Sequence, residues 1–145
     1  MPPDPVKSED ARAWLARAAA DLRAARNELA ADDPVLGDVV FHCQQAVEKA
    51  MKAFLTWHDV PFRKTHDLGV LGGQCAEIDG SLTDIMRRAA PMTEYAWKFR
   101  YPGEEFEPSR EEVDGSLATA RAAVMEITSR LPYEVIDQPG RPPAE

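Results

Sequence analysis

The sequence contains no apolar run approaching the roughly 18–20 residues that a membrane-spanning helix needs. Its first ten residues, MPPDPVKSED, also lack the apolar segment of a signal peptide. We therefore expect a protein that does not enter a membrane and that stays in the cytoplasm.

Cysteine is also scarce. Cys43 and Cys75 are the two cysteines of the chain, and they show neither the paired spacing of a zinc site nor the density of a secreted disulfide scaffold. Each has apolar neighbours, so we expect two reduced thiols in the core. We expect no metal and no cofactor.

Basic charge is not in excess. The chain has 17 Lys and Arg against 25 Asp and Glu, a net charge of −8, whereas proteins that coat nucleic acids are strongly basic. Residues 103–114, GEEFEPSREEVD, hold six acidic residues and one basic residue. The acidity is thus concentrated in one stretch, and a small phosphate site elsewhere in the chain is not excluded.

Strand-like alternation and internal repeats are absent, and helical periodicity takes their place. With 145 residues, the chain suits a single domain. The periodicity predicts an all-α, up-and-down bundle of four to five antiparallel helices, preceded by a flexible N-terminus over 1–7 and followed by an extended Pro-rich tail over 132–145. Within the bundle, residues 8–131, we expect helices at about 8–31, 34–58, 66–79, 82–99 and 109–131.

Local signals mark the predicted helix ends. Ser8, Asp33 and Ser109 are candidate N-caps, with Pro34 at the first helical position of the second helix. Ser81 followed by Asp84, and Ser109 followed by Glu112, have the spacing of a capping box. Pro91 predicts a kink or break in the fourth helix.

The second predicted helix, 34–58, has three distinct faces. Its buried line contains Leu36, Cys43, Ala50 and Phe54. A polar stripe on the opposite side is either a solvated face or an anion site, and it contains His42, Gln45, Lys49 and Lys52. A third sector mixes apolar and polar side chains, so it is either the edge of the core or a homodimer face, and it contains Phe41, Gln44, Glu48 and Leu55.

The segment 41–55, FHCQQAVEKAMKAFL, closely resembles the signature of the HEPN domain family. Three further features match in order: the pair Asp21-Leu22, the segment 65–68 (Thr-His-Asp-Leu), and Tyr95 followed by the segment 100–102 (Arg-Tyr-Pro). The resemblance spans about residues 10–130. It implies a helical bundle that is usually dimeric, and a nucleotide or RNA ligand. It also implies a separately encoded nucleotidyltransferase as partner, in some cases within a toxin–antitoxin pair.

Ribonuclease members of that family carry an Arg followed four to six residues later by His, which the resemblance would place at Arg100. No histidine follows Arg100 in that window, because His42, His58 and His66 all precede it. The family motif for metal-independent RNA cleavage is therefore absent. Arg100 and His66 stay as catalytic candidates only through a site assembled in space.

The remaining site residues each have a structural alternative. Arg100 is expected at the C-terminal end of a helix, where a cation is favourable for the dipole alone. His66 either pins the start of the third helix or binds a phosphate and shuttles a proton. The aromatic residues Trp97, Phe99 and Tyr101 either pack in the core or stack on bases.

Three hypotheses follow. The first is a nucleotide- or RNA-binding module that acts with a nucleotidyltransferase in a toxin–antitoxin-like pair, with phosphate held by His42, Gln45, Lys49, Lys52, His66 and Arg100. The second is a divergent metal-independent ribonuclease toxin. The third is a non-catalytic dimerisation bundle.

Overall fold

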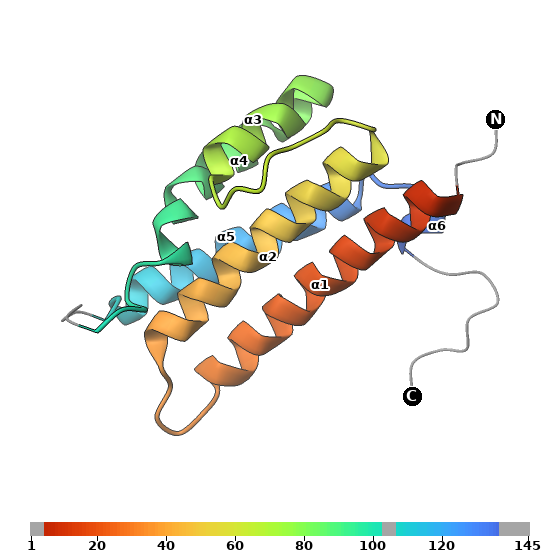
Figure 1. Cartoon of the computed structure of the whole chain (residues 1–145). Coiled ribbons are helices and arrows are strands. Elements are labelled where there is room, and N and C mark those ends of the chain that lie inside the picture. Colours follow the sequence, from red (N-terminus) through yellow and green to blue (C-terminus); the bar gives the residue numbers. More distant parts are fainter. Residues whose placement is uncertain (1–4, 103–106, 137–145) are drawn as a thin grey trace, which may run out of the picture.

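The computed structural model describes residues 5–102 and 107–136, and in these ranges it contains helices and no strand (Figure 1). The helices are α1 (Pro5–Leu29), α2 (Leu36–Trp57), α3 (Leu68–Ile78), η1 (Gly80–Leu82), α4 (Thr83–Ala89), η2 (Ala90–Ala96), α5 (Arg110–Thr128) and α6 (Tyr133–Ile136). The predicted all-α bundle is confirmed. None of the helices in the described part is long and apolar enough to cross a membrane.

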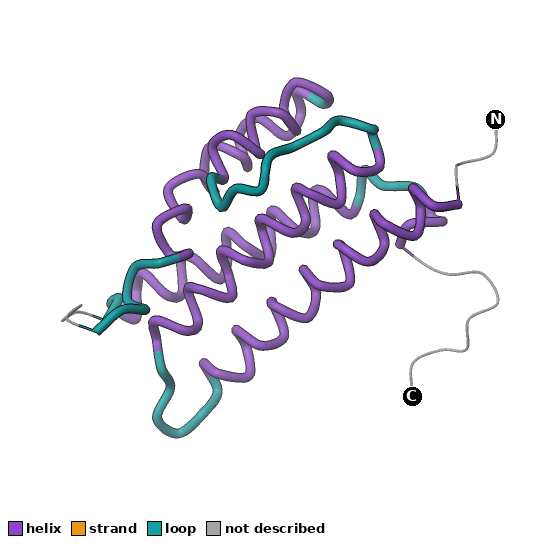
Figure 2. The backbone as a smooth tube through the Cα atoms, viewed as in Figure 1, coloured by secondary structure: helices purple, strands orange, loops and turns teal. Residues whose placement is uncertain are grey.

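Helix α2 lies at the centre of the bundle. It runs antiparallel to α1 and packs against α5, α3 and η2 as well (Figures 1 and 2). Its predicted apolar line is buried, with Cys43 and Ala50 at 0% exposure and Phe54 at 1%. The predicted core thiols are confirmed: Cys43 and Cys75 are free and buried, and burial raises the pKa of each to about 12. Both thiols therefore stay protonated at neutral pH.

Two predicted helix starts differ from the structure. Helix α1 begins at Pro5, so Ser8 lies within it and is buried instead of capping it. Helix α2 begins at Leu36, and its N-cap is Val35, which makes no side-chain capping bond. Asp33 and Pro34 therefore belong to the α1–α2 connection. The Glu28 carboxylate of α1 accepts a hydrogen bond from the Val35 amide at 3.2 Å, so the backbone N–H of the N-cap residue itself is satisfied.

The remaining helix starts show which of the predicted N-cap residues cap a helix in the structure. Ser109 accepts from the Glu112 amide at 3.0 Å, which confirms the predicted start of α5. Ser81 is not a cap, because the Asp79 carboxylate takes that role for η1 by accepting from the Ser81 amide. Asp67 caps α3 by accepting from the amides of Gly69 and Val70. A carboxylate at these positions suits the unsatisfied amides and the dipole of a helix start.

The break predicted at Pro91 is present. Helix α4 ends at Ala89, and the chain continues as the 3₁₀ helix η2. Beyond η2, Phe99 has a φ of 68°, a left-handed conformation that a bulky residue rarely adopts. Phe99 contacts Gly37 of α2, where an added Cβ would lie 3.0 Å from the Phe99 Cβ. This close approach fixes the direction of the chain that enters Arg100.

The two ends of the domain also differ from the prediction. Residues 5–7 belong to α1, and residues 133–136 form α6 in place of an extended tail. The Arg12 guanidinium donates to the backbone carbonyl of Glu134, so α6 is joined to α1. The rest of the predicted flexible and extended ends, residues 1–4 and 137–145, lies outside the described residues.

Candidate functional site

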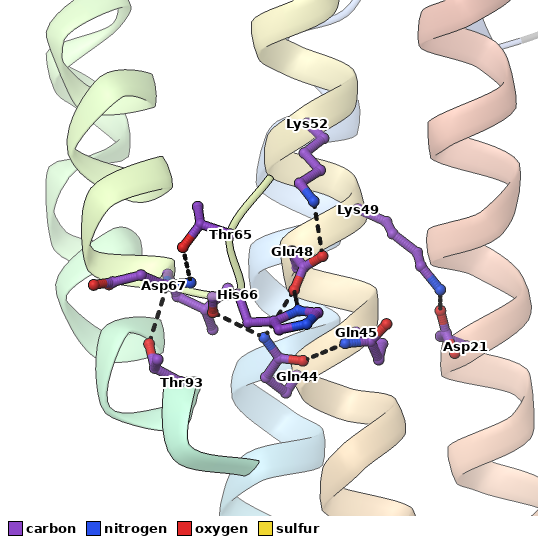
Figure 3. Close-up of polar contacts among 11 residues, drawn as sticks. Asp21, Gln44, Gln45, Glu48, Lys49, Lys52, Thr65, His66, Asp67 and Thr93 are labelled. Atoms are coloured by element: carbon purple, nitrogen blue, oxygen red, sulfur yellow. Dashed lines mark hydrogen bonds and ion pairs between the residues drawn. The ribbon is translucent and has the colours of Figure 1, made fainter. Parts of the chain in front are cut away.

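The polar side of α2 lies between α1 and the connection 58–67 (Figure 3). Helical spacing brings His42, Gln45 and Lys49 to this side, and the connection adds His66. In Figure 3, Gln45 lies between the group around His66 and the Lys49–Asp21 pair, and it donates to the Gln44 amide oxygen at 2.7 Å. The structure therefore assembles most of the predicted phosphate-binding residues on one surface.

Asp21 of α1 anchors one edge of this surface. Its carboxylate accepts from Lys49 Nζ at 2.6 Å and contacts His42 Nδ1 at 2.9 Å. The Asp21 side chain is 11% exposed, whereas those of Lys49 and His42 are 21% and 32% exposed. The carboxylate is thus more deeply buried than the cation and the imidazole that it holds.

Glu48 anchors the other edge in the same way. It is buried at 3% exposure, and it binds His66 Nδ1 at 2.7 Å, Lys52 Nζ at 2.9 Å and Gln44 Nε2 at 3.1 Å. Burial alone would raise the pKa of Glu48, but the hydrogen bonds from His66, Lys52 and Gln44 outweigh it and lower that pKa. Glu48 is therefore ionised at neutral pH.

His66 is held by the turn that starts α3. The Thr65 hydroxyl accepts from the Asp67 amide at 3.0 Å, and Thr93 of η2 accepts from the Leu68 amide at 3.0 Å. Gln44 donates to the His66 carbonyl at 3.1 Å. The His66 side chain nevertheless stays 61% exposed. His66 therefore pins the connection, and its phosphate-binding role stays a prediction.

Lys52 does not match its predicted role as a phosphate ligand. Its side chain is 9% exposed and paired with Glu48. Its ammonium also lies 5.3 Å from the ring centroid of Trp14 and 5.7 Å from that of Phe62. Lys52 therefore acts inside the fold, where it neutralises Glu48 and supports two aromatic rings.

Arg100 lies at the N-terminal end of α2. Its guanidinium stacks 3.7 Å from the Phe41 ring centroid and donates to Asp38 at 3.2 Å. It follows η2 by four residues, so the predicted position at a helix C-terminus is wrong. His66 is bound to Glu48, seven residues beyond Phe41, or about 10 Å along the helix. Arg100 and His66 thus occupy separate parts of the same face of α2.

Three of the four residues predicted for a dimer face are buried within the chain. Gln44 and Leu55 are 0% exposed and Glu48 is 3% exposed. This part of the prediction is corrected: the connection 58–67 and its neighbours cover that sector, so it is the edge of the core. Phe41 is half-buried and carries the Arg100 guanidinium.

The three aromatic residues near Arg100 differ in their exposure to solvent. Phe99 packs against the core and stacks on Tyr95, whereas Trp97 and Tyr101 are 47% and 64% exposed. Core packing is therefore correct for Phe99 alone. Residues 103–106 of the acidic stretch lie outside the described residues.

Sequence reasoning missed the contribution of α1. Asp21 was recognised only as part of a motif, and its role as the acceptor for His42 and Lys49 depends on the register of α1 against α2. Trp14 and Arg17 were also missed. They line a cavity of about 410 Å³ with Asp10 and Ala13 of α1 and with Lys49 and Thr56 of α2. The spacing of these four α1 residues, at positions 10, 13, 14 and 17, was the available signal for a shared face.

The fold and the site together define a helical bundle whose central helix carries His42 and Lys49 on one side, where the connection 58–67 adds His66. Within the described residues, no group of three or more His, Cys, Asp or Glu side chains is arranged to hold a metal ion. The family model described as HEPN domain matches residues 11–131. The chain therefore belongs to the HEPN domain family, which makes it a nucleotide- or RNA-related module in general terms. No curated protein and no solved structure matched the chain significantly.

Proposed function

We propose that the protein binds nucleotides or RNA through phosphate, on the side of α2 where His42 and Lys49 lie next to His66 of the connection 58–67. One observation carries this proposal: two largely buried carboxylates, Asp21 and Glu48, hold the more exposed nitrogen groups of His42, Lys49 and His66. A donor that is already oriented loses less conformational entropy when a ligand binds. The carboxylates lie below the surface, so a phosphate meets the donors first.

The chemistry of the exposed groups fits a phosphate. Lys49 uses one of the three protons of its ammonium group on Asp21, and the others remain available. Arg100 adds a planar guanidinium that matches a phosphate with two parallel hydrogen bonds. Its pair with Asp38 is partly exposed, at 37% and 48% for the two side chains. Such pairs contribute little, so a phosphate can replace Asp38 at small cost.

We also propose that the module acts with a separately encoded nucleotidyltransferase in a toxin–antitoxin-like pair, and that it forms a homodimer. Family membership supports this proposal. Co-expression with a nucleotidyltransferase encoded beside its gene, followed by co-purification, tests the first part. Light scattering of the purified chain tests the second.

The binding proposal predicts a specific loss in Arg100→Ala. Calorimetric titration of the wild-type chain with ATP and with a short single-stranded RNA should give measurable heat. Arg100→Ala should weaken binding by about tenfold, because a charged hydrogen-bonding group is lost. His66→Ala should weaken it as well.

Arg110→Ala is the matched control, since Arg110 is an exposed arginine whose ion pair is with Asp114 of its own helix α5. Its affinity should equal that of the wild type. Equal affinity of Arg100→Ala, His66→Ala and the wild type would refute phosphate recognition by this side of α2.

A second candidate function is metal-independent RNA cleavage, and the contact between His66 and Glu48 favours it. The ionised Glu48 accepts a hydrogen bond from Nδ1–H of the tautomer that leaves the lone pair on Nε2, and the side chain is 61% exposed. Incubation of RNA with the protein in the presence of a chelator would test this. Cleavage should be lost in His66→Ala and Arg100→Ala and retained in His58→Ala. If the wild type leaves RNA intact, or if cleavage survives His66→Ala, His66 is not a catalytic base.

A further inference from the structure

We propose that the groove between α1 and α2 binds one nucleoside 5′-phosphate unit, with its phosphate on Arg17 and Lys49 and its base against Trp14. The cavity of about 410 Å³ falls within the roughly 300–1,000 Å³ of typical ligand sites. This inference rests on the proposed nucleotide binding and assigns it a specific site.

The groove has chemically different ends. Arg17 and Lys49 lie near the end where Lys49 is bound to Asp21, and Arg17 makes no ion pair with any described residue. Asp10 lies seven residues before Arg17, which is about 10 Å along α1. Two cations at one end and a carboxylate at the other set the direction of a ligand. The phosphate binds the cations, and a hydroxyl or amino group donates to Asp10.

Trp14 lies between these ends and provides a rigid apolar surface. Its ring contacts Phe62 edge-on, with centroids 6.2 Å apart, and the Lys52 ammonium lies 5.3 Å from its centroid. Lys52 is itself fixed by buried Glu48. The neighbouring Ala13 leaves the groove open beside the indole. An aromatic ring held in place in this way can stack on any base, because every base has a π-face.

Lys49 connects this groove with the polar side of α2. It lines the groove and also belongs to the pair with Asp21 that lies next to His42. A nucleotide in the groove therefore places its phosphate beside the other donors of α2. Arg17 and Trp14 belong to the groove alone, which allows the two sites to be tested separately.

The test is calorimetric titration of the full chain with AMP, adenosine and inorganic phosphate. AMP should bind more tightly than adenosine or phosphate, since it alone uses both the cations and the indole. Arg17→Ala should weaken AMP binding by about tenfold or more. Arg23→Ala is the matched control, because Arg23 is an exposed arginine on the same helix outside the groove, and it should leave the affinity unchanged.

Trp14→Ala should weaken AMP binding by about tenfold or more through lost stacking. Trp14→Phe, which keeps a smaller ring beside Phe62, should weaken it less. Thermal melts of both variants show whether the fold is intact. If Trp14→Ala unfolds, the AMP affinity of Trp14→Phe is used to test the role of Trp14. Competition with a short single-stranded RNA identifies the source of the ligand. If the RNA displaces AMP, the groove binds a nucleotide that is part of an RNA strand. If it does not, the groove binds a free nucleotide.

The inference is overturned if Arg17→Ala and Arg23→Ala bind AMP equally, or if adenosine binds as tightly as AMP. Its failure differs from failure of the proposed function. If Arg100→Ala and His66→Ala weaken nucleotide binding while Arg17→Ala and Trp14→Phe do not, the α2 surface binds the ligand and the groove does not. If no variant and no ligand gives a change in heat, both proposals fail.

Discussion

Glu48 shows how a single side chain organises both parts of the site. One of its carboxylate oxygens binds His66, which faces the solvent, and the other binds Lys52, which lies over Trp14. Its burial is tolerable because three donors satisfy it. Removing the charge would leave Lys52 buried without a counterion. At the scale of one residue, stability and ligand recognition thus depend on the same carboxylate.

Glu48→Gln should therefore lower the free energy of unfolding by about 3 kcal/mol at neutral pH, the cost of breaking a buried ion pair. Urea denaturation followed by circular dichroism measures this loss. Glu94→Gln is the matched control, because Glu94 pairs with Lys98 on the exposed surface. Its effect should stay below about 1 kcal/mol. Equal losses in the two variants would contradict the role given to Glu48.

The pH dependence of stability tests the same residue. The pKa of Glu48 is lower in the folded protein than its ordinary value of 4.5, so the folded state favours the ionised form. The resulting stabilisation is complete above pH 4.5 and is lost as the pH falls through the lowered pKa. Wild-type stability should decline in this acidic range, and Glu48→Gln should decline less steeply. Parallel curves for the two proteins would refute the linkage.

Individual site residues were predictable from the sequence only in part. His42, Gln45 and Lys49 share one side of α2 because a helix repeats every 3.6 residues. The roles of Asp21 and His66 were not predictable, because their partners lie 18–28 positions away in the chain. Lys52 was misassigned for a similar reason, since only the packed fold shows that Phe62 and Trp14 cover it.

Among the elements, the contact between α2 and the chain after η2 matters most for the site. Gly37 allows Phe99 to lie against α2, and Phe99 in turn directs Arg100 onto Phe41. The left-handed backbone at Phe99 is costly, and residues in such conformations concentrate at functional positions. The position of Arg100 therefore depends on a glycine more than sixty residues earlier.

Gly37→Ala should consequently destabilise the protein by about 1 kcal/mol or more, because the added methyl group crowds the Phe99 Cβ. Gly73 of α3 is the matched control, since a Cβ there meets nothing within 4 Å. Gly73→Ala should stabilise the protein by about 0.5–1 kcal/mol through helix propensity. Thermal denaturation measures both, and a stabilising Gly37→Ala would contradict the contact.

The existence and order of the long helices were predictable, and their starts were not always so. Apolar periodicity located α1, α2, α3 and α5 because each buries one face. Ser109 identified its helix start because its hydroxyl meets the amide three residues on. Ser8 and Asp33 misled, because α1 extends further toward the N-terminus and α2 begins without a side-chain cap. Capping residues in the sequence do not predict where a helix begins when tertiary packing sets its first residue.

At the scale of the whole molecule, burial decides which surfaces are available to a second copy. Leu55 and Gln44 are fully buried in one chain, so they contribute to the core and not to an association surface. A homodimer of this protein would have to use other residues.

Leu55→Ala should lower the free energy of unfolding by about 3 kcal/mol, since it opens a cavity in the core. The oligomeric state of the folded variant should equal that of the wild type in sizing chromatography with light scattering. Val70→Ala, at a half-exposed apolar position on α3, is the control with little effect on either measurement. A change of oligomeric state in Leu55→Ala without loss of stability would restore Leu55 to an interface.

The contact between α6 and α1 has a consequence for how the domain can be joined to other proteins. Arg12 bonds to the carbonyl of Glu134, so positions 5 and 136 lie at the same end of the bundle (Figure 1). Arg100 and the start of α2 lie at the opposite end. A short linker could therefore connect residue 136 back to residue 5, and a circularly permuted chain could open in the α1–α2 connection. The domain could likewise be inserted into a loop of a host protein with its Arg100 end directed outward.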